Sequence, residues 1–154
     1  MKTIISKVYI LLVAFVFFAC NSNVVYDENK EVDSQVWKTT DKLYYEVEIT
    51  DTLKAYKLAI NIRNTVEYPY SNVYFYLNTI LPNGKVTKSD TIECYLDGTW
   101  KGKGDSKIKD NRFWIAKNVK FNQIGKYIFE LRQATIDSTL KGICDVGLHL
   151  EYQD

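Results

Sequence analysis

Apolar and polar residues alternate with a period of two along most of this chain, and this pattern strongly limits the folds open to it. Every second residue is apolar in three runs, which cover residues 43–49, 56–62 and 73–77. Successive side chains of a strand point to opposite faces, so such runs are typical of antiparallel strands with one buried face. The sequence therefore predicts an all-β domain.

Turn-forming residues separate the expected strands. Pro82-Asn83-Gly84 is a strong hairpin signal, because glycine accepts a positive φ at little cost. Ala134–Leu140 is the one stretch in which a helical turn is expected. Further strands are expected at residues 24–32, 85–96, 111–121, 126–133 and 143–152, which gives about eight in total. We predict an antiparallel β-sandwich of immunoglobulin-like or jelly-roll type, with a closed lipocalin-type barrel as the alternative.

Residues 1–19 have the composition of an export signal. Two lysines precede an uncharged apolar run at residues 8–19, which is shorter than the about 20 residues that a membrane-spanning helix needs. Ala19 directly precedes Cys20, and lipoprotein signal peptidase requires a small residue before a cysteine that carries the lipid. We therefore expect lipidation of Cys20; an ordinary cleaved signal or an uncleaved anchor is the alternative. The expected organisation is a signal at 1–19, an acylated tether and edge strand at 20–40, and the sandwich domain at 41–154.

A lipidated Cys20 would fix the location of the protein. Two or three acyl groups hold a protein firmly to its membrane, whereas a single acyl group binds weakly. Asn21 occupies the position where an acidic residue would favour retention in the inner membrane, so the outer membrane is expected. Loss of Lys2 and Lys7 with the signal lowers the formal charge from +1 by two units, to −1. Such a near-neutral chain gives no electrostatic reason to expect nucleic acid as a partner.

Residues able to perform catalysis are few. His149 is the sole histidine, and it lies in an alternating strand, where a structural or solvent-facing role is the simpler interpretation. The chain has no GxSxG elbow and no cysteine–histidine cluster for a metal ion. The sequence thus predicts neither an enzyme nor a cofactor.

Two cysteines remain besides Cys20. Cys94 and Cys144 both lie in expected strands. In an oxidising compartment they could form a disulfide, but buried free cysteines also behave as small hydrophobic residues. Both interpretations stay open at the level of the sequence.

Two aromatic segments are candidates for partner binding. Tyr68 and Tyr70 flank a proline at a loop-to-strand junction, where their rings could contact a protein or a sugar, or could cap the sandwich. Trp100 lies in a glycine-punctuated loop with Lys101 and Lys103 on its C-terminal side. This loop could be a binding loop with an aromatic anchor, or a bulge in which the indole packs on the sheet.

Several segments together resemble one protein family. They are Arg63–Phe75, which contains Tyr68-Pro69-Tyr70-Ser71-Asn72, then Asp90–Glu93, Gly98–Gly104, Gly125–Tyr127, and Leu140–Leu148, which contains Asp145-Val146-Gly147. In this order and spacing they resemble the gliding-motility lipoprotein GldH family of Bacteroidota over nearly all of the mature chain.

The resemblance implies an outer-membrane lipoprotein that faces the periplasm. In gliding bacteria the family is needed for surface movement and for the associated type IX secretion of adhesins, and related copies occur in species that do not glide. The implied role is that of an accessory or assembly component, without catalytic activity or cofactor, acting with other envelope lipoproteins or outer-membrane proteins. A glycan-binding β-sandwich module is the alternative that Tyr68, Tyr70 and Trp100 leave open.

Overall fold

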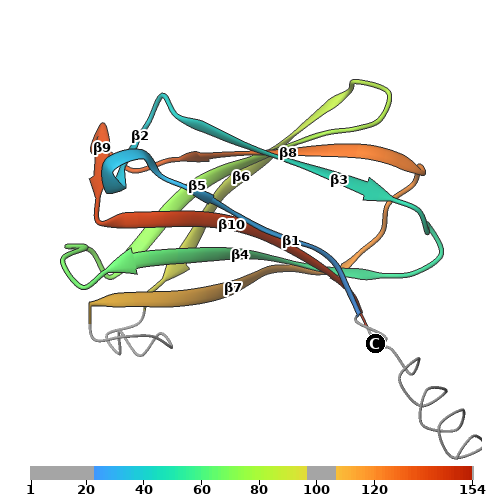
Figure 1. The fold of residues 1–154 in the computed structure, drawn as a ribbon. Helices are drawn as coiled ribbons and strands as arrows, with labels where there is room; N and C mark the ends of the chain where they lie inside the picture. Colours follow the sequence, from blue (N-terminus) through green and yellow to red (C-terminus); the bar gives the residue numbers. More distant parts are fainter. Residues whose placement is uncertain (1–22, 97–106, 154) are drawn as a thin grey trace, which may run out of the picture.

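The computed structural model describes residues 23–96 and 107–153, and within them the chain is almost entirely strand (Figure 1). Apart from one short 3₁₀ turn, η2 (Asp33–Gln35), the regular elements are strands. Their bounds are β1 (Val24–Glu31), β2 (Val36–Lys38), β3 (Lys42–Ile49), β4 (Tyr56–Thr65), β5 (Asn72–Ile80), β6 (Val86–Tyr95), β7 (Ile108–Val119), β8 (Gly125–Gln133), β9 (Thr139–Lys141) and β10 (Ile143–Tyr152).

The two halves of the chain pair with each other in nested order. β1 pairs with β10, β2 with β9, β3 with β8, β4 with β7, and β5 with β6, all antiparallel. The centre of this nest is the turn at residues 81–85, where Gly84 has φ +79° and its N–H donates to Leu81 O at 2.8 Å. The described chain is therefore one long hairpin, and the turn predicted at Pro82-Asn83-Gly84 is confirmed as its tip.

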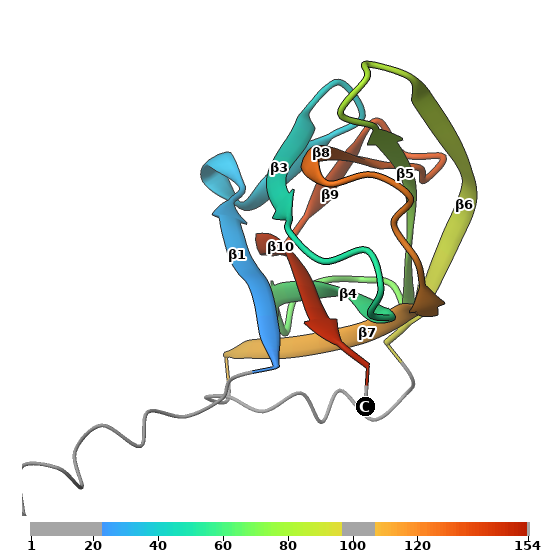
Figure 2. The same cartoon turned by 90° about the vertical axis from the view of Figure 1, so that its right-hand side faces the viewer.

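Rolling this hairpin produces two four-stranded sheets that face each other (Figures 1 and 2). The first sheet has the order β1-β10-β4-β7, and the second has the order β3-β8-β5-β6. The short pair β2-β9 stands apart from both. The predicted β-sandwich is confirmed, and its nested connectivity is that of a jelly roll. The sheets remain separate, so the lipocalin-type alternative is not adopted.

The apolar side chains of the period-two runs fill the space between the sheets. Tyr45, Val47 and Ile49 of β3 are buried, and the residues between them face outward. Ile60 of β4 and Phe75 of β5 are likewise fully buried. Burial of one such large apolar side chain stabilises the fold by about 1.5–3 kcal/mol, so the alternation predicted from the sequence supplies the main driving force for the sandwich.

One expected element, a helical turn, is absent, and hydrogen bonds from a side chain take the place of its backbone hydrogen bonds. The helical turn predicted at residues 134–140 is wrong: the chain runs as a loop into β9. The buried side chain of Gln133 accepts from Thr135 N at 3.0 Å and donates to Asp137 O at 3.1 Å. These bonds satisfy backbone groups that a helical turn would otherwise have paired.

A hydrogen bond from Tyr45 links the two sheets through the core. Its hydroxyl donates to the carbonyl oxygen of Val146, on β10 of the first sheet, at 2.6 Å. The ring is completely buried, and Lys30 Nζ of β1 lies 5.4 Å from its centroid. Burial is the main cause of the raised pKa of this phenol, which therefore stays a donor. Tyr45 thus fixes the position of β3 relative to β10.

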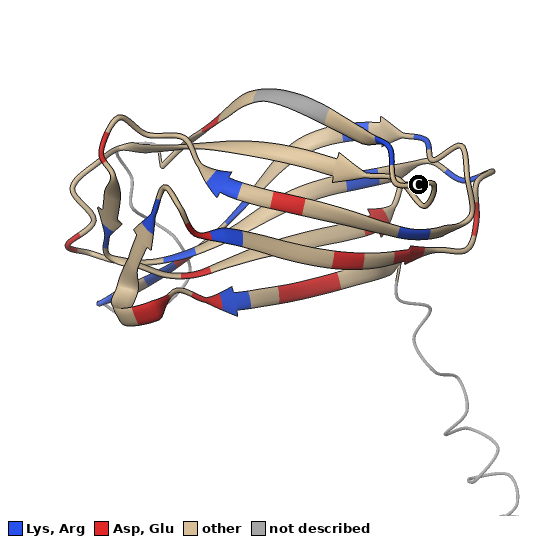
Figure 3. Ribbon diagram, turned by 90° about the horizontal axis from the view of Figure 1, so that it is seen from above, with Lys and Arg blue, Asp and Glu red and all other residues tan. Residues whose placement is uncertain are grey.

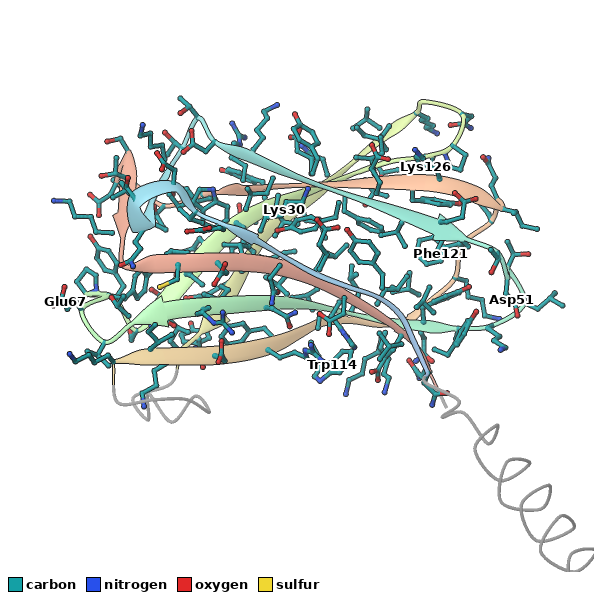
Figure 4. All side chains as sticks on the ribbon, in the orientation of Figure 1. Lys30, Asp51, Glu67, Trp114, Phe121 and Lys126 are labelled. Atoms are coloured by element: carbon teal, nitrogen blue, oxygen red, sulfur yellow. The ribbon has the colours of Figure 1, made fainter. Side chains whose placement is uncertain are left out.

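The sandwich has two distinct ends. The proximal end carries Asn23 together with loops 50–55 and 120–124, and the distal end carries loops 66–71 and 134–138 (Figure 4, where Asp51 and Phe121 mark one end and Glu67 the other). Residues at the proximal end are tied to the start of the described chain: Tyr152 N donates to Asn23 O and Gln153 N to Ala55 O, both at 2.8 Å.

We expect Tyr45→Phe to lower the free energy of unfolding by about 1–2 kcal/mol, because it leaves the Val146 carbonyl without its buried partner. Urea denaturation followed by fluorescence would measure the change. Tyr44→Phe, on the outward face of the same strand and 42% exposed, is the matched control and should stay within about 0.5 kcal/mol of the parent. Equal losses in the two variants would contradict the proposed link between the sheets.

Candidate functional site: a distal pocket and a polar network on the first sheet

A network of polar side chains covers the outer face of the first sheet. His149 lies there on β10, yet it is only 1% exposed. Its Nε2 lies 3.0 Å from Glu151 Oε2, and its Nδ1 lies 3.0 Å from Asp27 Oδ2, in a direction that does not make a regular hydrogen bond. The Trp114 ring meets the imidazole edge to face, with 5.6 Å between centroids.

Two arginines extend this network across the strands. Arg112 of β7 donates to Asp27 Oδ2 at 2.8 Å and to Asn61 Oδ1 at 2.7 Å. Arg63 of β4 donates to Asp110 Oδ1 at 2.6 Å and also lies 3.3 Å from Asp145 Oδ2. Partial burial acts to raise the pKa of Asp27, but the contacts with His149 and Arg112 outweigh it and hold that pKa below its ordinary value. Each arginine of the network therefore faces at least one carboxylate from a neighbouring strand.

A close backbone approach organises the centre of the network. Gly147 of β10 lies beneath the side chain of Asn29, and a Cβ placed on Gly147 would fall 1.8 Å from Asn29 Oδ1. Asn61 donates to that same oxygen at 3.1 Å. Only glycine leaves room for this row, which explains the need for glycine in the Asp145-Val146-Gly147 segment.

The distal end carries a half-open pocket of about 410 Å³. Its walls come from the β4–β5 loop, from β5 and from the loop after β8. The lining residues are Tyr70, Asn72, Tyr74, Ala134, Thr135, Ile136 and Asp137. The Gln133 hydrogen bonds described above hold the 134–137 side in place, and Ala134 N donates to Tyr74 O at 2.8 Å. The pocket is thus built from pinned segments, with the fully exposed Ile136 at its rim.

Tyrosine–carboxylate pairs supply the polarity of the pocket. Tyr70 Oη donates to Asp137, and Tyr74 Oη donates to Glu93 Oε1 at 2.5 Å. Asn72 Nδ2 also donates to Glu93 Oε1, at 2.7 Å. The bond from Tyr74 is the main cause of the lowered pKa of Glu93, and the bond to Asp137 raises the pKa of Tyr70. The pocket therefore combines aromatic faces with hydrogen-bonding groups of fixed orientation.

The structure separates the two tyrosines singled out in the sequence. Tyr70 is 40% exposed and lines the pocket, whereas Tyr68 is 3% exposed and belongs to the core. Tyr68 donates from its hydroxyl to Asn72 O at 2.9 Å and packs edge to face against Tyr70 at 5.6 Å. Tyr68 therefore supports Tyr70 from below, which is the capping role that the sequence left open.

Trp100, Lys101, Lys103 and Cys20 lie outside the described residues. The two ends of the segment that contains Trp100 are nevertheless placed. Leu96 N donates to Ser71 O at 2.6 Å, and Val66 N donates to Lys107 O at 3.1 Å. The segment between Leu96 and Lys107 therefore leaves and re-enters the fold beside loop 66–71, at the distal end.

The two remaining cysteines are free thiols in the structure. Cys94 lies on β6 of the second sheet and Cys144 on β10 of the first, and both are buried. Burial raises the pKa of the Cys94 thiol to about 12, and burial also raises the pKa of Cys144. Thiols with so little thiolate are poor nucleophiles and react slowly.

Three further observations describe the part of the chain that the structure covers. Within residues 23–96 and 107–153, no group of three His, Cys, Asp or Glu side chains is arranged to hold a metal ion. In the same described part, none of the helical structure has the length and apolarity to cross a bilayer. In the view of Figure 3, positions of Lys or Arg and positions of Asp or Glu are interspersed along the strands.

The fold and the site define an antiparallel jelly-roll sandwich with a pocket at one end and a network of ion pairs on one face. Comparison with known proteins identifies the particular family. The sequence profile described as GldH lipoprotein matches residues 24–150, and the chain belongs to this family. The resemblance drawn from the sequence segments is thereby confirmed.

Two relatives are similar over nearly their whole length. One is "Gliding motility lipoprotein GldH homolog" of Christiangramia forsetii, 34% identical over 164 aligned residues, which cover 100% of this chain and 99% of the relative. The other is "Gliding motility lipoprotein GldH" of Flavobacterium johnsoniae, 34% identical over 155 residues, which cover 94% of this chain and 95% of the relative. Both are named as gliding-motility lipoproteins rather than as enzymes.

Sequence reasoning missed the network around His149. The alternation of β10 placed the imidazole on the outward face, but not beneath Trp114 and between two carboxylates. The one available signal was the glycine two residues before it, because a glycine within a strand indicates a close approach by another group. The partner, Asn29, lies on β1, and only the strand pairing identifies it.

Glu151 gives the network a pH dependence that can be tested. Lys57 Nζ lies 2.6 Å from Glu151 Oε1, and this contact, followed by that with His149, lowers the pKa of Glu151. A carboxyl with a depressed folded pKa stabilises the fold above its unfolded pKa, and the contribution is lost as the pH falls through the folded value. We expect Glu151→Gln to cost about 1 kcal/mol or less at neutral pH, and the deficit to shrink as the pH falls below the ordinary pKa of a glutamate and through the lowered folded value.

Urea unfolding at a series of pH values, on the chain without residues 1–19 and with Cys20→Ser, would measure this deficit. Lys57→Met removes the main cause of the pKa shift and should reproduce the same pH-dependent loss. A deficit in Glu151→Gln that stays constant as the pH falls would contradict the assigned ion pair.

Proposed function

We propose that this chain is a lipid-anchored, non-catalytic accessory or assembly component of a gliding-motility or type IX secretion-related envelope machinery. Cys20 carries the acyl chains, the anchor lies in the outer membrane, and the domain faces the periplasm. Other envelope lipoproteins or outer-membrane proteins are the partners, and the distal end meets them. The names of the two relatives, both gliding-motility lipoproteins, support the part of this proposal that concerns lipidation and motility.

The observation that carries the proposal is the separation of the anchor from the pocket. β1 begins at Val24, only four positions after Cys20, and it begins at the proximal end. Tyr70 and both ends of the segment that contains Trp100, Lys101 and Lys103 lie at the opposite end. A domain held at one end presents its other end away from the membrane, where partners can reach it.

The chemistry of the described residues favours binding over catalysis. His149 faces two carboxylates rather than a hydroxyl or thiol that it could activate. Neither Cys94 nor Cys144 is an activated nucleophile, since burial raises the pKa of both. By contrast, an exposed tyrosine backed by a buried aromatic ring is the kind of anchor found at the centre of protein interfaces.

Two substitutions test this proposal in the native host. Cys20→Ala should abolish incorporation of labelled palmitate and release the protein from the outer-membrane fraction. Tyr70→Ala should keep the protein in that fraction but lower the recovery of copurifying envelope proteins by about tenfold or more, as expected for loss of a central anchor. Affinity isolation with quantitative mass spectrometry gives the readout.

Tyr44→Ala is the matched control, because Tyr44 is exposed to a similar extent, 42% against 40% for Tyr70, on the outward face of β3. It should leave the copurifying proteins unchanged. Retention of every partner by Tyr70→Ala, or unchanged motility and adhesin secretion after deletion of the gene in a gliding host, would contradict the proposed role.

Glycan binding is a second candidate function, favoured by the composition of the distal pocket. Tyr70 and Tyr74 offer ring faces on which a sugar could stack, and Asn72 and Asp137 offer hydrogen-bonding groups. A glycan that binds there should do so with an affinity that falls about tenfold or more in Asp137→Ala, which removes a polar partner without removing a ring. A glycan array followed by calorimetry tests this, and an array without hits would remove the candidate.

A further inference from the structure

Three exposed apolar side chains cluster at the proximal end. Leu53, in the loop between β3 and β4, is 89% exposed, and Ile124, in the loop between β7 and β8, is 64% exposed. Val24, at the first position of β1, is also exposed. Single exposed apolar residues are ordinary, but three at one end of a sandwich form a patch that favours an apolar environment.

The loop that carries Leu53 has a defined shape. Asp51 Oδ1 accepts from Leu53 N at 2.8 Å and from Lys54 N at 3.3 Å, and Tyr56 Oη donates to Asp51 O at 2.5 Å. The carboxylate of Asp51 is therefore turned to its own backbone, and the Leu53 side chain is held outward from the turn.

The loop that carries Ile124 is fixed in the same way. Phe121 packs edge to face on Tyr56 at 5.0 Å, and Tyr127 Oη donates to Gln123 O at 3.1 Å. Tyr56 thus contacts both loops, and Asp51 and Phe121, one from each loop, lie at the same end of the sandwich (Figure 4).

The chain that precedes the domain is too short to hold this end away from the anchor. Asn23 is bonded to Tyr152, and Gln153, the next residue, is bonded to Ala55 of the first loop. Cys20 lies three residues before Asn23, and an extended chain spans at most about 3.5 Å per residue, so the two Cα atoms are no more than about 11 Å apart. An acylated Cys20 at the bilayer surface therefore keeps the two loops near the lipid headgroups.

The charges of the two loops suit the same surface. Residues 50–55 and 120–124 contain Lys54, Lys120 and one acidic residue, Asp51. Lys54 Nζ lies 4.0 Å from Asp51 Oδ2 and 4.0 Å from the centroid of the Tyr152 ring, whereas Lys120 is exposed. Lysines next to an anchored segment are attracted to anionic headgroups. The loops thus combine apolar tips with basic residues, the usual composition of segments that enter a membrane interface.

We infer that the proximal end rests on the bilayer, with Leu53 and Ile124 entering the boundary between headgroups and acyl chains and the exposed Lys120 facing lipid phosphates. This inference rests on the proposed lipidation of Cys20. Its consequence is a defined orientation. The long axis of the sandwich stands away from the plane of the bilayer, and the distal pocket points away from the lipid.

Fluorescent probes at single introduced cysteines test this orientation. Leu53→Cys and Ile124→Cys are each labelled with an environment-sensitive nitrobenzoxadiazole group in the full lipidated protein, in vesicles of phosphatidylethanolamine and phosphatidylglycerol. Ile136→Cys, at an exposed isoleucine of the distal end, is the matched control. Cys94 and Cys144 should not take up label, because they are buried thiols with raised pKa values, and the parent protein checks this.

Probes at positions 53 and 124 should show a blue shift, a severalfold rise in emission, and quenching by spin-labelled lipid, while the probe at position 136 shows none of these. Unshifted probes at 53 and 124 in protein that floats with the vesicles would overturn the orientation and leave the lipidation intact. A blue shift without quenching by the lipid label would also overturn it, since another surface would then cover the loops.

Failure of the lipidation itself gives a different result. Protein that carries no palmitate and does not float with vesicles would contradict the proposed function rather than the orientation alone. Mass spectrometry of the N-terminal peptide separates these two cases before any probe is read.

Discussion

The nested pairing of the two halves of the chain is the constraint on which the rest of the structure depends. Each strand of the first half finds its partner in the second half, and only the pairing next to the 81–85 turn is local in sequence. Such long-range pairing carries a large loop-closure cost, so neither half has a sheet of its own to fold into. The same pairing brings Asn23 beside Tyr152 and sends loops 66–71 and 134–138 to the other end.

Two glycines of the second half allow other residues to pack directly on the backbone, which strand pairing alone does not determine. Gly147 admits Asn29 at the centre of the polar network, and Gly142, with φ +87°, admits Thr65 and the backbone of Tyr68 near the distal end. Both glycines lie in the Leu140–Leu148 segment by which the family resemblance was drawn. This segment therefore contacts both the polar network on the first sheet and the residues that support Tyr70.

Much of this architecture was predictable from the sequence, because period-two alternation and a proline–asparagine–glycine turn are local signals. The eight long strands, the buried face of β3 and the tip at Gly84 all follow from them. The short strands β2 and β9 were missed because three residues carry no recognisable period. Tyr68 and His149 could not be placed because their burial depends on side chains that only the folded sheets bring near, such as Tyr70 and Trp114.

The position of β1 has a mechanical consequence. This strand connects the folded domain to Cys20, and it pairs with β10 along its length, from Val24 opposite Glu151 to Glu31 opposite Asp145. With the proposed anchor at Cys20 and the proposed partner at the distal end, a pull between them would act along the axis of β1. The ladder of hydrogen bonds runs across that axis, so the whole ladder resists in shear and no single bond is peeled first. A domain tied in this way can transmit tension without unzipping from the end by which it is held.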